Sequence, residues 1–171
     1  MLKKLAGSII FILVLHSLIA VLESGSSDSS TAVTKITATV LPCVNVSAPV
    51  DIRIWELKPS EPGIYTKKGV LKVAANTGWK VMVKDTDAVT SGHLTEWTGE
   101  DYTDRKLQAP LSVSASQDVS LPEGGTIETG TNIGEEEVEV TLKQVVSWDD
   151  LHLADGHVYH IALDFEGSTL E

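Results

Sequence analysis

Apolar and polar residues alternate with a period of two along most of the chain after residue 30. Such alternation is typical of β-strands with one buried face, and no stretch in this region has the spacing of an amphipathic helix. On both sides of residues 76–78, apolar residues occupy every second position between Leu71 and Val83. This pattern predicts a β-hairpin with Trp79 on its buried face and lysines on its outer face. Further strands are predicted within residues 44–48, 52–54, 111–121, 138–143 and 159–166.

Seven to nine short strands separated by Pro- and Gly-rich turns indicate an all-β fold. Strands with alternating faces are what two packed antiparallel sheets require. We therefore expect an antiparallel β-sandwich, immunoglobulin-like or jelly-roll-like. At 171 residues the chain suits one domain with a sizeable core, which we place at residues 33–171.

The N-terminal segment has the features of an export signal. Residues 1–4 include two lysines, residues 5–22 are almost entirely apolar, and the small residues Ser24, Gly25 and Ser26 follow. This pattern predicts a signal peptide over residues 1–26 and a flexible Ser-rich linker over residues 27–32. The apolar run is also long enough to act as an uncleaved membrane anchor. In both cases the rest of the chain is expected outside the cell, either secreted or at the cell surface.

The chain is acidic, with a formal net charge of −11. A negative surface repels nucleic acid and anionic lipid headgroups, so neither is expected as a partner. Membrane contact is expected only through residues 5–22, and only if they are not cleaved. The expected partners are other copies of the protein or other components of the cell surface.

Cys43 is the only cysteine, so an intramolecular disulfide is impossible. It is expected either as a small buried apolar residue or, on the polar face of its strand, as a site for an intermolecular disulfide. The tripeptide Asn45-Val46-Ser47 is an N-glycosylation sequon, and the alternation places Asn45 on the polar face. Asn45 is therefore a candidate glycosylation site.

No recognisable catalytic motif is present. The sequence lacks G-x-S-x-G, H-E-x-x-H and the glycine-rich phosphate-binding loops. His157 and His160 lie three residues apart on a predicted strand, which places them on opposite faces and makes them a poor chelating pair. We therefore expect a non-enzymatic protein.

The long polar segment 85–110 offers weak candidates for binding. Its carboxylates permit a Ca²⁺ site, but they lack the spacing of a known calcium loop, so no cofactor is expected. Trp97 in this segment, and Trp148 further along, lie among polar residues and are candidates for glycan binding or for closing the ends of the sandwich. The carboxylates in question are Asp85, Asp87, Asp101 and Asp104.

Residues 31–41, "TAVTKITATVL", form a predicted strand ahead of the main body of the domain. Ile36, Ala38 and Val40 fall on one face. The segment is too short to bury that face alone, so it must add to a sheet edge. It would serve either as the first strand of its own domain or as a strand donated to another copy.

Four stretches carry a resemblance to a known group: "ITATVLPCVNVSAP", "LKVAANTGWKVMVKD", "GHLTEWTGEDY" and "DGHVYHIALDF". Together with the signal segment, they resemble in layout the TasA/camelysin-like biofilm fibre proteins and the subunits of archaeal surface filaments. The resemblance implies a jelly-roll-like sandwich and assembly by donor-strand exchange. The expected function is that of an extracellular structural protein, a filament or matrix subunit that donates residues 31–41. The alternative is a secreted glycan- or surface-binding module acting through Trp97 and Trp148.

Overall fold

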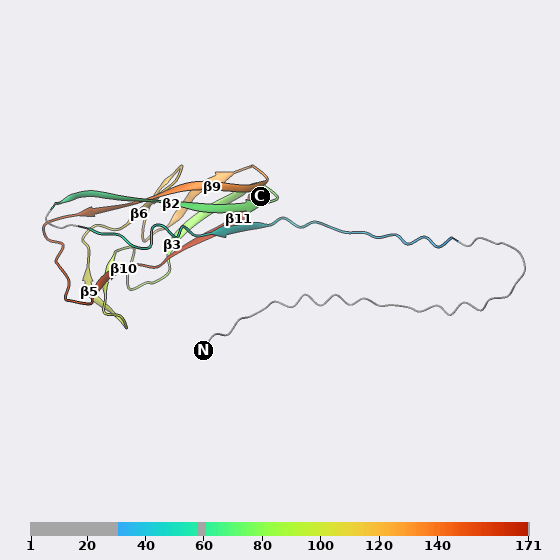
Figure 1. Cartoon of the computed structure of the whole chain (residues 1–171). Coiled ribbons are helices and arrows are strands. Elements are labelled where there is room, and N and C mark those ends of the chain that lie inside the picture. Colours follow the sequence, from blue (N-terminus) through green and yellow to red (C-terminus); the bar gives the residue numbers. More distant parts are fainter. Residues whose placement is uncertain (1–30, 58–60, 171) are drawn as a thin grey trace, which may run out of the picture. The chain divides into compact units, whose positions relative to one another are not determined.

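The computed structural model describes residues 31–57 and 61–170. The chain divides into two units, Met1–Ala38 and Thr39–Glu171. The described residues contain eleven strands in antiparallel sheets and no helix, which confirms the expected all-β class but exceeds the predicted seven to nine strands (Figure 1). No helix in these ranges is long and apolar enough to cross a membrane. The predicted signal peptide lies outside the described residues.

The largest sheet has five strands in the order β1-β2-β9-β6-β7. Its centre is a ribbon of two long strands, β2 and β9, which pair along all 13 residues of each. Ion pairs such as Lys68–Glu139 join the outer faces of these strands, as expected from their alternating charges. The strands are β1 (Val44–Ser47), β2 (Gly63–Ala75), β6 (Ser112–Ser114), β7 (Asp118–Ser120) and β9 (Gly134–Val146).

A second sheet has three strands in the order β11-β3-β8. These are β3 (Trp79–Asp85), β8 (Gly125–Gly130) and β11 (Leu163–Thr169). Buried side chains from this sheet and from the five-stranded sheet belong to one hydrophobic cluster, because the apolar positions of both sheets point inward. Trp79 is its largest fully buried side chain, which confirms its predicted place in the core. Other members are Leu71, Val73, Val81, Val83, Val113, Ile127, Val138 and Val140.

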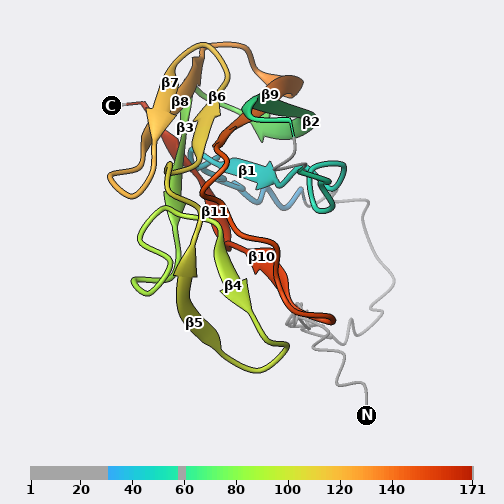
Figure 2. The same ribbon diagram turned by 90° about the vertical axis from the view of Figure 1, so that its left-hand side faces the viewer.

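The third sheet has the order β10-β4-β5, with β4 (Thr95–Trp97), β5 (Tyr102–Lys106) and β10 (Val158–His160). Figure 2 shows these strands together on one side of the molecule, away from β2 and β9. Two of them lie inside the segment 85–110 that was expected to be a polar loop. The segment therefore has regular structure of its own, in strands too short for alternation to reveal.

The predicted hairpin between residues 71 and 83 is wrong in its pairing. β2 pairs with β1 and β9, whereas β3 pairs with β11 and β8, so the chain passes from one sheet to the other at residues 76–78. The alternation correctly identifies the buried face of each strand. It does not identify the partner, because both strands turn their apolar side chains toward the same core between the sheets.

Three other predicted strands also differ from the structure. Residues 111–121 form the hairpin β6–β7, and residues 159–166 divide between β10 and β11, which belong to different sheets. Residues 52–54 form no strand. In residues 111–121 the apolar parity continues across the turn between β6 and β7, so the pattern conceals the break there.

Candidate functional site

A groove lined by apolar side chains and by several polar ones, such as Arg53, Glu56 and Asp155, lies in the Thr39–Glu171 unit, with Leu142 of β9 in its wall. The cavity has a volume of about 870 Å³. One wall is the irregular segment 48–57, and the opposite wall is formed by residues 151–161. The apolar side chains that line it are Ile52, Trp55, Leu57, Leu94, Leu111, Leu142, Leu151, Leu153, Val158, Ile161, Leu163 and Phe165.

The groove arises from a mismatch in strand length. β2 and β9 have 13 residues each, whereas β3 and β11 have seven. At about 3.3 Å per residue, the ribbon is longer than the strands of the facing sheet by about 20 Å. Leu142 on the inner face of β9 lines the groove, whereas Gln144 and Val146 nearer the end of the strand are buried. An added Cβ at Gly69 of β2 would lie 2.7 Å from Cγ2 of Ile52, so segment 48–57 lies directly against the ribbon there.

A buried carboxylate holds the third sheet to the wall of the groove. The side chain of Glu96 in β4 is only 8% exposed. It accepts a hydrogen bond from Thr103 Oγ1 at 2.7 Å, and its other oxygen lies 2.8 Å from Nδ1 of His157, which lines the groove. These two hydrogen bonds, and more weakly the nearby Arg105, hold the pKa of Glu96 below its ordinary value despite its burial. Glu96 is therefore ionised at neutral pH and links two strands to the 151–157 wall.

The predicted assembly segment is not a strand in this chain. Residues 31–43 have no regular secondary structure, and the first strand of the folded unit is β1. Ile36 and Val40 are 90% and 85% exposed, and Ala38 between them is exposed as well. Val33 and Leu41 are also highly exposed. The segment thus presents a row of apolar side chains to solvent.

Asn76, at the crossing between β2 and β3, fixes the chain where this segment leaves the domain. Its Nδ2 donates to the carbonyl oxygen of Leu41 at 2.9 Å, and its Oδ1 accepts from the backbone N–H of Cys43 at 2.7 Å. The backbone N–H of Asn76 also donates to the carbonyl of Cys43 at 3.2 Å. Three hydrogen bonds and the fixed φ of Pro42 therefore hold residues 41–43 in one direction. Sequence reasoning missed Asn76, because a turn residue of this type usually serves only its own turn.

Cys43 and Asn45 lie on either side of the start of β1. Cys43 is exposed, so the buried alternative is wrong and its thiol is accessible. Asn45 is exposed on the outer face of β1, as the alternation predicts. Glycosylation of Asn45 remains a prediction.

The four candidate calcium ligands do not form one site. The carboxylate of Asp85 accepts hydrogen bonds from Thr90 Oγ1 and from the backbone N–H groups of Asp87 and Gly92. Asp87 Oδ1 in turn accepts from the N–H of Val89 at 2.9 Å. These two residues therefore shape the loop that follows β3. Asp101 and Asp104 lie on the exposed β4–β5 hairpin, and the described part of the chain contains no group of three potential metal ligands.

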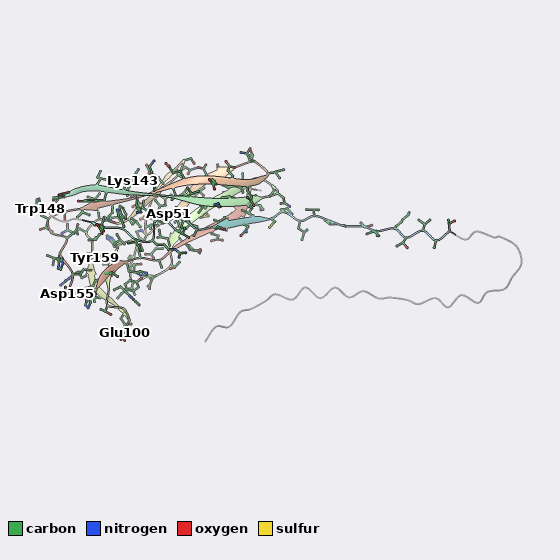
Figure 3. All side chains as sticks on the ribbon, in the orientation of Figure 1. Asp51, Glu100, Lys143, Trp148, Asp155 and Tyr159 are labelled. Carbon is green, nitrogen blue, oxygen red and sulfur yellow. The ribbon has the colours of Figure 1, made fainter. Side chains whose placement is uncertain are left out.

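The two candidate tryptophans lie in different surroundings. Trp97 is half-buried and contacts Tyr102, with ring centroids 4.9 Å apart, and His160, at 5.8 Å. Trp148 is 72% exposed in the loop after β9 and does not line the cavity beside Trp97. Figure 3 shows Trp148 at the end of the ribbon and Glu100 at the tip of the β4–β5 hairpin. Trp97 belongs to β4 and Trp148 to the loop after β9, and a role of either ring in binding remains a prediction.

Comparison with known proteins finds no relative: no family model matches the sequence, and no curated protein matches it either.

Proposed function

We propose that the protein is a non-enzymatic structural subunit of the cell surface that assembles with copies of itself through residues 31–41. The observation that carries this proposal is the exposure of Ile36 and Val40 in a segment that forms no strand in its own chain. A row of exposed apolar side chains offers a surface that a partner can cover. The apolar stretch at residues 5–22 supports an extracellular setting.

The five-stranded sheet and the sheet β11-β3-β8 are inferred to form the layers of a β-sandwich, immunoglobulin-like or jelly-roll-like. Their buried side chains share one cluster, which supports this inference. In such a sandwich, each sheet has edge strands whose backbone groups can pair with an added strand. β1 and β11 are edges of their sheets among the described strands.

The groove suits the apolar face of the donated segment. Ile36, Ala38 and Val40 of one copy would enter the groove of the next while the backbone pairs with a strand edge. The hydrogen bonds of Asn76 to Leu41 and Cys43 fix the point on the folded unit from which the donated segment would extend. Because each copy donates and accepts, the contact is head-to-tail and grows a fibre.

The test compares substitutions on the two faces of the segment in the intact mature protein. Ile36→Asp with Val40→Asp is expected to abolish polymers in negative-stain images and in sedimentation velocity. Thr37→Asp with Thr39→Asp adds the same charge to the opposite face and is the matched control, expected to retain polymers. A synthetic peptide of residues 31–41 is expected to raise the melting temperature of a chain lacking residues 27–41, whereas a scrambled peptide is not. A protein that remains monomeric at every concentration, or that polymerises equally with both variants, would exclude this function.

A further inference from the structure

A second cavity lies on the third sheet, on the face opposite Glu96. Its volume is about 770 Å³, and it is separate from the apolar groove described above except that His160 borders both. Three stretches contribute to it: the loop after β3, the β4–β5 hairpin and the end of β10. Its lining includes Asp87, Trp97, Glu100, Asp101, Tyr102 and His160.

Three rings form a rigid platform in this cavity. Trp97 and Tyr102 are register partners across β4 and β5, and their rings meet edge to face at an interplanar angle of 65°. His160 lies 5.7 Å from Tyr102 between ring centroids, and its Nδ1 is 2.6 Å from the hydroxyl oxygen of Tyr102. Strand pairing and this hydrogen bond hold the rings in place without a ligand, so a ligand would not have to order them.

The charged groups that surround the platform are carboxylates. Asp87, Glu100 and Asp101 line the cavity, and no lysine or arginine among the described residues does. The side chains of Glu100 and Asp101 make no ion pair within residues 31–57 and 61–170. Burial, and then the negative charges of Asp87 and Asp85, raise the pKa of the Tyr102 hydroxyl. The negative charges that make deprotonation of Tyr102 unfavourable also make the binding of a cation in this cavity favourable.

We propose that this cavity binds an organic ammonium ion, with its alkyl groups on the Trp97–Tyr102 platform and its charge toward Glu100 and Asp101. An alkylated ammonium uses both features of the site, because aromatic faces attract cations and carboxylates attract positive charge. An anionic ligand would be repelled. A divalent metal ion would require converging oxygen ligands, which this cavity does not bring together among the described residues.

The same cation can come from two sources, a free quaternary ammonium compound or a trimethyl-lysine side chain of another protein. Choline and a short peptide with one trimethyl-lysine are the two probes. A peptide that binds at least tenfold more tightly than choline identifies a protein as the source. Comparable affinities identify a small molecule.

The experiment is an NMR titration of the intact protein with choline at constant ionic strength, followed through the indole N–H resonances. We expect the resonance of Trp97 to move with a saturating curve and that of Trp148 to remain in place. The neutral isostere 3,3-dimethylbutanol has the shape of choline without its charge, and it is expected to bind at least about tenfold more weakly.

Two variants test the two halves of the site. Trp97→Leu is expected to abolish choline binding, with Trp148→Leu as the matched control that retains it. Trp97→Leu also removes packing, so a second test leaves the rings unchanged. The double variant Glu100→Gln with Asp101→Asn, at two exposed positions, is expected to lower the affinity for choline several-fold. Three results would overturn the proposal: equal affinity for the neutral isostere, unchanged affinity in the amide variant, or a Trp97 shift with a neutral oligosaccharide and none with choline.

Discussion

The two ends of the β2–β9 ribbon are covered in different ways. At one end the sheet β11-β3-β8 lies across the ribbon, and Leu71, Trp79 and Val81 are at most 1% exposed. Nearer the other end, segment 48–57 lies against the ribbon at Gly69, and a cavity of about 870 Å³ is lined by Leu142 of β9 together with segments 48–57 and 151–161. The same two strands contribute to both ends, so the difference comes from what lies opposite them. Regular sheets interdigitate closely, whereas irregular segments must also satisfy their own backbone groups and leave gaps.

This difference assigns separate roles to the two ends. The packed end stabilises the fold strongly, because large side chains such as Trp79 are removed from water there. The groove end contributes less to folding and retains an apolar surface that another chain could cover. Four predictions test this division, and they are arranged from the largest expected effect to the smallest.

Trp79→Ala is expected to cost about 3–5 kcal/mol, because it removes the largest buried side chain of the packed end. The measurement is the free energy of unfolding from urea denaturation. Trp148→Ala, at a 72% exposed position, is the control and should change stability by less than about 0.5 kcal/mol. Equal effects of the two substitutions would contradict the placement of the core.

The same substitution at both ends compares them directly. Leu71→Ala at the packed end should cost about 2–5 kcal/mol, since Leu71 is fully buried and its removal leaves a cavity. Leu153→Ala, half-buried on the wall of the groove, should cost about 1 kcal/mol. Chemical denaturation of both variants under the same conditions gives the difference. A larger loss at Leu153 would mean that the groove end is the better packed of the two.

Gly130→Ala tests how closely the packed end is filled. An added Cβ at this position would lie 2.3 Å from Cζ2 of Trp79, which is closer than two non-bonded carbon atoms can approach. We expect a loss of about 1–3 kcal/mol, measured as a lower midpoint of unfolding in urea. Gly63→Ala is the matched control, because no atom lies within 4 Å of its added Cβ, and it should leave stability nearly unchanged. A neutral Gly130→Ala would show that the Trp79 ring has room to move.

Glu96→Gln tests the acid sensitivity of the groove end. Hydrogen bonds from Thr103 and His157 hold the pKa of Glu96 below its ordinary value of about 4.5. A carboxyl whose pKa is lowered by folding stabilises the protein fully above its unfolded pKa, and this contribution is lost as the pH falls through its folded pKa. We therefore expect the variant to be less stable at neutral pH and to lose less stability than the wild type below about pH 4.5.

Unfolding midpoints measured from neutral to acidic pH check this expectation. Glu135→Gln, at an exposed position on β9, is the control and should follow the wild-type profile. Parallel profiles for Glu96→Gln and the wild type would show that Glu96 does not couple folding to pH.

The sequence alone was sufficient for properties that depend on which side of a strand faces inward. Alternation predicted the all-β class, the burial of Trp79 and the exposure of Asn45 correctly. It also predicted a strand over residues 31–41 with Ile36, Ala38 and Val40 on one face, but this segment forms no strand in the structure and all of these side chains are exposed. A period of two is a local property of the backbone, so a short stretch of sequence contains it completely.

Only the tertiary structure decided which strands pair and where the cavities lie. β2 and β3 follow one another in the chain, yet they belong to different sheets, and β2 pairs instead with the distant β9. The groove, the Asn76 hydrogen bonds and the Trp97–Tyr102–His160 platform all join segments far apart in the sequence. Strand pairing uses backbone groups that are the same in almost every residue. The choice among partners therefore depends on how all the strands fill one core, and no local pattern contains that information.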